Sequence, residues 1–146
     1  MKISDVVALG VNEILGLHAA ILDETGGAPG MRDAGLLASA VARPMQAFGD
    51  ELVFPSLAQM AAALASGIIL NHPFVDGNKR TGLSAAFLFL RLNGYQLVRD
   101  TEHWVAIAVK VACHEWAMDQ LAESYAACMG GDSFVELDEP PNDCLV

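Results

Sequence analysis

An uncharged, apolar stretch in the middle of the chain constrains the fold more than any other feature. No Asp, Glu, Lys or Arg occurs from Leu52 to Val75. Its continuous apolar part, about Leu57 to Leu70, is too short to cross the hydrocarbon core of a bilayer. The abundance of alanine and leucine favours helix over strand. We therefore expect a buried core helix that begins just after Pro55, at Ser56, and no membrane span.

Apolar residues recur at helical spacing along most of the remaining chain, with capping residues at plausible boundaries. The other expected helices run from Asn12 to near Gly26, from Asp33 to before Pro44, from about Asn78 to Asn93, from Asp100 or Thr101 through Val111, and from Met118 to Met129. Tyr95–Val98 is at most a short strand. About six helices, without repeats or an internal linker, predict a compact all-α domain over residues 1–129.

The composition changes after Gly130. Five of the eighteen acidic residues follow it, with no basic residue and with two adjacent prolines. We expect residues 130–146 to form an acidic, disordered tail. A transient cover of the tail over Lys79 and Arg80 is an alternative, which deletion of residues 130–146 would test by nucleotide affinity.

The charge balance limits the kind of partner. With 18 acidic and 8 basic residues the formal net charge is -10, which opposes direct binding to nucleic acid and to anionic membrane surfaces. Three cysteines without a CxxC pair, and an N-terminus unlike a secretory signal, indicate the reducing cytosol and a cytoplasmic protein. Between His72 and Arg91, however, three cations face only one acid, which suits the phosphates of a single nucleotide.

The segment HPFVDGNKRTG, His72 to Gly82, joins two apolar helices and carries more polar chemistry than packing requires. If a helix starts near Asn78, the free N–H groups of Gly77, Asn78 and Lys79 point at one spot and form a phosphate site. Lys79 and Arg80 add positive charge there. The segment lacks the GxxxxGK[ST] pattern of a Walker loop.

Two other side chains of this segment complete a catalytic set. Asp76 can hold Mg²⁺ by one carboxylate while phosphates and water fill the remaining positions. His72 can take a proton from an attacking hydroxyl near neutral pH. A base, a metal ligand and an anion clamp together indicate phosphoryl or nucleotidyl transfer. Phe74 is expected to anchor the loop in the core. An ordinary turn with no chemistry is the alternative.

HPFVDGNKR resembles the signature of the Fic/Doc (Fido) superfamily, and its lysine at position 79 resembles the Doc (death-on-curing) type. The resemblance extends over GLHAAILDETGGAPGMRDAGLLASAVARPMQ, Gly16 to Gln46, and FLFLRLNGYQL, Phe87 to Leu97. It implies the helical Fic/Doc fold, with the active loop at a helix N-terminus. It also implies His72 as general base, Asp76 as the Mg²⁺ ligand, and Gly77, Asn78, Lys79 and Arg80 as the cradle for ATP, with His72, Asp76 and Arg80 as the catalytic residues.

The Doc resemblance implies transfer of the γ-phosphate of ATP to a protein Ser/Thr hydroxyl, on elongation factor Tu, by a toxin of a type II toxin–antitoxin system that inhibits translation. A cognate antitoxin would be its partner. Two alternatives stay open: AMP transfer as in the adenylylating Fic branch, and a catalytically idle binding module with the same fold.

One residue and one loop outside the motif allow two interpretations each. His18 lies on the first helix, where a histidine is more often a core or surface residue than a catalyst, although Doc-like chains also carry a histidine here. The loop from Gly26 to Asp33 is either a plain connection between helices or, through Arg32 and Asp33, one edge of the groove for the target or the antitoxin.

Overall fold

The computed structural model describes residues 1–98, 100–130 and 133–138, and within them the chain forms six α-helices and one small hairpin. The helices are α1 (Val11–Thr25), α2 (Ala34–Ala42), α3 (Leu57–Asn71), α4 (Asn78–Leu92), α5 (Thr101–Ala112) and α6 (Met118–Met129). Two 3₁₀ turns, Ile3–Asp5 and Arg43–Met45, complete the helical part. The expected all-α fold is confirmed, and no helix in the described residues is long and apolar enough to cross a membrane.

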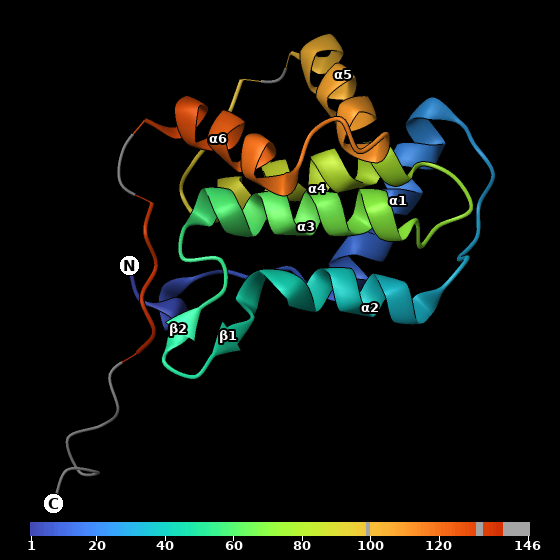
Figure 1. The fold of residues 1–146 in the computed structure, drawn as a ribbon. Helices are drawn as coiled ribbons and strands as arrows, with labels where there is room; N and C mark the ends of the chain where they lie inside the picture. Colours follow the sequence, from blue (N-terminus) through green and yellow to red (C-terminus); the bar gives the residue numbers. More distant parts are fainter. Residues whose placement is uncertain (99, 131–132, 139–146) are drawn as a thin grey trace, which may run out of the picture.

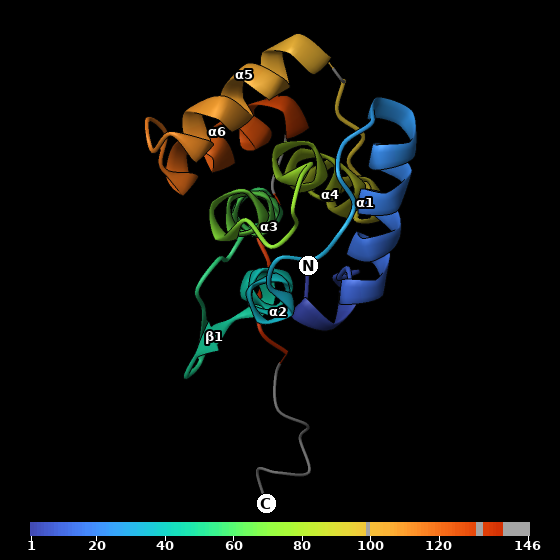
Figure 2. The same cartoon turned by 90° about the vertical axis from the view of Figure 1, so that its right-hand side faces the viewer.

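Helix α3 is the central element of the fold. Every residue from Leu57 to Ile69 except Gln59 is buried, as the apolar stretch predicts. Its side chains pack against α2, α4 and α6, and Figures 1 and 2 show these helices around it. The helix begins where the Ser56 hydroxyl accepts a hydrogen bond from the Gln59 N–H at 3.1 Å. Burial of this helix on several sides fixes where its C-terminal end lies.

Helix α4 lies directly against α3 because Gly82 allows a close approach. A Cβ atom at Gly82 would stand 2.9 Å from the Ala65 carbonyl oxygen and 2.9 Å from Ile69 Cγ1. Both atoms belong to α3, so a larger residue would force the two helices apart. The connection between the end of α3 and the start of α4 is therefore a short loop, residues 72–77, held between two packed helices (Figure 2).

Most expected helix boundaries agree with the structure. The side chains of Asp33, Ser56 and Asp100 all cap the helices that follow them. The first helix differs, because it begins at Val11 rather than after an Asn12 cap. The Glu13 carboxylate accepts a hydrogen bond from the Gly10 N–H at 3.1 Å. This contact satisfies a backbone donor at the residue just before Val11, so the helix can begin there.

A small antiparallel hairpin, β1 (Ala47–Phe48) and β2 (Glu51–Leu52), precedes α3, with Ala47 opposite Leu52 and Phe48 opposite Glu51. The sequence pattern does not indicate it, because two-residue strands are too short to show alternation. It lies at the end of α3 opposite the 72–77 loop (Figure 1). Tyr95–Val98 contains no strand.

The C-terminal segment departs from the expected tail. Val135 is 4% exposed, its N–H donates to the Pro55 carbonyl at 2.7 Å, and the Leu57 N–H donates to the Ser133 carbonyl at 2.9 Å. The expectation of a disordered tail is therefore wrong for residues 133–138, because these backbone groups pair with the start of α3 and with the N-terminus. The rest of that expectation, at residues 131–132 and 139–146, lies outside the described residues.

Candidate active site at the junction of α3 and α4

His72 stands at the C-terminal end of α3 in an unusual backbone conformation. Its φ and ψ are 52° and 53°, the left-handed region that glycine usually occupies at a helix end. Its N–H donates to the Ile68 carbonyl at 3.2 Å, so α3 closes its last turn here. The side chain is exposed, and it leaves the helix at the point where the loop begins. The imidazole therefore lies at the surface, where the 72–77 loop begins, and not in the core.

Phe74 and Asn78 hold the middle of the loop. Phe74 is 1% exposed and Asn78 is 4% exposed. The Asn78 Oδ1 atom accepts from the Phe74 N–H at 3.0 Å, and the Asn78 side-chain amide donates to the Phe74 carbonyl at 2.9 Å. Phe74 is confirmed as the core anchor. Because the Asn78 side chain is engaged with Phe74, Asn78 could contact a ligand at the start of α4 only through its backbone N–H.

His18 supports the same loop from α1. Its ring is stacked on the Phe74 ring with centroids 3.7 Å apart and planes inclined by 7°. Its Nε2 lies 2.8 Å from the Asp76 carbonyl oxygen, which requires a proton on that nitrogen for a hydrogen bond. The side chain is 6% exposed. His18 is therefore a core residue that fixes the backbone at Asp76, a contact that the sequence pattern does not reveal.

Asp76 is exposed and retains capacity to bind a cation. Its Oδ1 accepts the N–H of Gly77 at 2.9 Å and its Oδ2 accepts the N–H of Ala28 at 3.3 Å. A carboxylate has about four acceptor positions, so further positions remain for a metal ion. Within the described residues no three His, Cys, Asp or Glu side chains converge on a metal site. A hard cation held by Asp76 would thus need phosphate and water oxygens, which is how Mg²⁺ is commonly bound.

The start of α4 has no side-chain cap, so its backbone donors are open to an anion. Gly77, with φ 80° and ψ 15°, turns the chain into the helix, and no side chain caps it. The prediction that the Gly77 N–H is free is wrong, because this N–H donates to Asp76 Oδ1. The N–H groups of the first turn, at residues 78–80, are the donors that the geometry offers to an anion.

Lys79 and Arg80 are both exposed beside these N–H groups. In the part of the chain that the structure describes, neither forms a salt bridge. Two cations without an acidic partner next to a positive helix end suit the phosphates of a nucleotide. The six residues predicted as the site, His72, Asp76, Gly77, Asn78, Lys79 and Arg80, therefore lie together in one loop and one helical turn.

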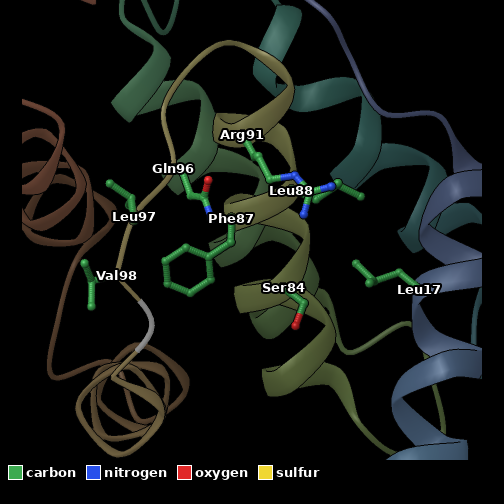
Figure 3. A pocket seen from close by; sticks show the side chains of 8 residues that line it. All are labelled: Leu17, Ser84, Phe87, Leu88, Arg91, Gln96, Leu97 and Val98. Carbon is green, nitrogen blue, oxygen red and sulfur yellow. The ribbon is translucent and has the colours of Figure 1, made fainter.

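Two adjoining cavities run along α4 from this site. The smaller, about 270 Å³, is lined by Arg80, Phe87 and Trp104 among others. The larger, about 690 Å³, is shown in Figure 3 between Leu17 of α1, the α4 side chains and the segment after α4. Both are lined by Ser84 and Phe87, so they are neighbours along α4, with Arg80 lining the smaller and Arg91 lining the larger. We call the two neighbouring cavities together the depression along α4. This depression can receive an extended ligand beside the phosphate site.

A family model matches most of the part of the chain that contains the candidate site. The sequence model of the Fic/DOC family matches residues 8–90, which include α1, α2, α3 and most of α4. The chain therefore belongs to the Fic/DOC family.

Two relatives place it in the Doc type of that family. Toxin Doc of Mycolicibacterium smegmatis (strain ATCC 700084 / mc(2)155) is 40% identical over 103 residues, covering 69% of this chain and 79% of the relative. Protein kinase doc of Escherichia phage P1 is 32% identical over 118 residues, covering 81% of this chain and 92% of the relative. The resemblance based on His72 to Gly82 is confirmed.

Proposed function

We propose that this protein is a Doc-like toxin that transfers the γ-phosphate of ATP to a Ser/Thr hydroxyl of a protein, elongation factor Tu, and so inhibits translation in the cytoplasm. The observation that carries the proposal is the uncapped start of α4 between Asp76 and the unpaired cations Lys79 and Arg80. The name of the phage P1 relative, a protein kinase, supports phosphate transfer rather than another use of the site.

The chemistry follows from the arrangement of the loop. The first-turn N–H groups of α4, with Lys79 and Arg80, hold the phosphates and offset their charge as the reaction proceeds. The His72 imidazole accepts the proton of the acceptor hydroxyl as its oxygen attacks the γ-phosphorus. The bond from the γ-phosphorus to the bridging oxygen breaks, ADP leaves, and the proton stays on His72. Asp76 would hold Mg²⁺, which offsets charge on the phosphates when bound.

Parallel labelling distinguishes this reaction from its alternatives. Purified protein is incubated with a cell lysate, Mg²⁺ and ATP labelled at the γ- or the α-phosphate. Label from γ-labelled ATP alone on one band, absent with His72→Ala, supports phosphate transfer to that protein. Label from α-labelled ATP would instead support the adenylylating alternative. No label from either nucleotide would favour the binding module without catalysis.

We propose that an antitoxin segment occupies the depression along α4. Its lining mixes apolar side chains with polar ones, among them Arg80 and Glu24 in the smaller cavity and Arg91 in the larger. These features suit an amphipathic segment with acidic residues, which would also cover Arg80 at the phosphate site. Arg32 and Asp33 are not needed as an edge of this groove, because the Arg32 guanidinium is directed at the end of α3.

The groove proposal is tested with Leu17→Arg, which alters the larger cavity, whose lining does not include Arg80. We expect antitoxin binding, measured by calorimetry, to be lost while phosphate transfer by the free protein persists. Unchanged antitoxin affinity would refute the groove assignment without affecting the proposed reaction.

A further inference from the structure

The backbone of His72 needs support from outside its own helix. A left-handed conformation is unfavourable for a residue with a Cβ atom, and among the described residues only His72 and His114 combine a side chain with positive φ. Such a conformation persists where the surrounding structure imposes it. The exposed imidazole makes no hydrogen bond within the described residues that would hold it directly. The restraint must therefore act on the backbone.

Arg32 provides that restraint through three consecutive carbonyl groups. Its Nε donates to the His72 carbonyl at 2.6 Å and its Nη2 donates to the Asn71 carbonyl at 2.6 Å. Its backbone N–H donates to the Pro73 carbonyl at 2.7 Å. The first two carbonyls are at the negative end of α3, where an arginine is favoured by charge. A planar guanidinium that binds two carbonyls at once limits how the peptide planes on either side of His72 can rotate.

The segment that carries Arg32 is itself held in register along the loop. Met31 and Phe74 form an antiparallel bridge, and the Val75 N–H donates to the Gly30 carbonyl at 3.0 Å. The Asp33 N–H also donates to the Pro73 carbonyl at 3.0 Å. Figure 2 shows the connection between α1 and α2 passing beside the connection between α3 and α4. The guanidinium is thus aimed at the end of α3 by backbone pairing, in addition to its own contacts.

We propose that Arg32 is a positioning residue that fixes the left-handed backbone of His72 and thereby aims the imidazole at the acceptor hydroxyl. The direction of the His72 Cα–Cβ bond follows from φ and ψ, so rotation of either adjoining peptide would move the ring. The inference rests on the proposed function of His72 as general base. Arg32 itself need not touch ATP or the protein substrate.

A role in binding substrate would use the same exposed arginine differently. An arginine that binds phosphate or an acidic target acts through its charge, so Arg32→Lys would preserve much of that role. The positioning role requires donors to the carbonyls of Asn71 and His72 in fixed geometry. A single ammonium group reproduces that geometry poorly. If Arg32 acts as a positioning residue, Arg32→Lys and Arg32→Gln should lower kcat alike. Both should leave KM unchanged for ATP and for the protein substrate.

The test compares both Arg32 variants with Asp33→Ala in the full chain. Asp33→Ala keeps the neighbouring backbone contacts but removes the side-chain cap on α2, where Oδ1 accepts the Leu36 N–H at 2.9 Å. Asp33→Ala is therefore the control, a variant that loses stability in the same segment without losing the contacts of Arg32. The readouts are the backbone chemical shifts of His72, which report its dihedral angles, together with kcat and KM.

We expect Arg32→Gln and Arg32→Lys to shift the His72 signals and to lower kcat by roughly 10- to 100-fold, since small misplacement of a catalytic group has effects of this order. Asp33→Ala should leave the His72 signals and kcat unchanged at temperatures below the melting temperature of the variant. Unshifted His72 signals in the Arg32 variants, or a raised KM with normal kcat, would overturn the proposal. If the wild-type protein transfers no phosphate, the proposed function fails, and the chemical shifts alone decide whether Arg32 holds the backbone.

Discussion

Replacement of Asn78 by alanine tests whether the loop between α3 and α4 must be held rigidly for phosphate transfer. The variant removes both hydrogen bonds to the Phe74 backbone, at 3.0 and 2.9 Å, and leaves a buried N–H and a buried carbonyl without partners. Each unpaired buried polar group costs about 1–3 kcal/mol, so for the two groups we expect a total loss of about 2–6 kcal/mol in the free energy of unfolding.

The assay is urea denaturation together with phosphate transfer to the protein substrate. With a denaturant slope of about 2 kcal/mol per molar, the urea midpoint should fall by about 1–3 M. The variant should still be folded without urea, because small domains have total stabilities of about 5–15 kcal/mol. Loss of the Phe74 anchor displaces the backbone that carries Asp76, so we expect transfer to fall by about 100-fold or more.

Asn93 offers a matched control at the other end of α4. It is 8% exposed, accepts the Val7 N–H at 2.8 Å and donates to the Val7 carbonyl at 2.9 Å, and it also donates to Phe89. By the helical rise, its α-carbon is about 22 Å from that of Asn78. Asn93→Ala should lower stability by a similar amount and leave transfer unchanged. Equal activities of the two variants would refute the reasoning.

Four further substitutions test other parts of this interpretation. Gly26→Ala and Gly27→Ala both place a side chain at positive φ, each costing about 1–3 kcal/mol. Only at Gly27 would a Cβ atom stand 2.9 Å from an Asp76 oxygen, so only Gly27→Ala should raise the Mg²⁺ concentration needed for transfer, by roughly 10-fold. His18→Phe keeps a ring over the loop but leaves the Asp76 carbonyl without its partner, and should reduce stability by about 1–3 kcal/mol in thermal denaturation. Tyr125→Phe removes a buried hydroxyl that lacks a hydrogen-bond partner among the described residues, and should raise stability at neutral pH by about 1 kcal/mol. Burial raises the pKa of Tyr125 above 10.0, so above pH 10 only the unfolded phenol ionises, and wild type should lose about 1.4 kcal/mol per pH unit relative to the variant. Equal alkaline stability of the two proteins would contradict this.

The helices were predictable because their signals are local. The uncharged run before His72 indicates a buried helix, and α3 is buried along most of its length. The side chains of Asp33 and Asp100 mark helix starts through contacts with residues three positions away. Information of this kind lies within a few residues of sequence, so composition and spacing reveal it.

The residues of the candidate site were predictable for the same reason, but their supports were not. His72 to Arg80 are contiguous, whereas Arg32 reaches His72 across 40 positions and His18 reaches Asp76 across 58. No periodicity or spacing reports a contact between segments so far apart. Asn78 illustrates the limit, because the motif includes it in the candidate site while its side chain is hydrogen-bonded to the backbone of Phe74.

The C-terminal segment shows how composition can mislead. Its acidic residues and prolines indicate solvation, yet Val135 is buried and its neighbours pair with the start of α3 and with the N-terminus. Glu136 pairs with Lys2 at 3.3 Å on the surface. A single apolar residue supported by backbone hydrogen bonds is enough to dock this extended segment, and such a short pattern does not stand out in an acidic sequence.

The central claim is most directly tested by the intact mass of purified elongation factor Tu after incubation with this protein, ATP and Mg²⁺. We predict an increase equal to one phosphoryl group on a Ser or Thr residue, dependent on ATP and absent with His72→Ala. An increase equal to one adenylyl group, an unchanged mass, or the same phosphoryl increase with His72→Ala would contradict the account.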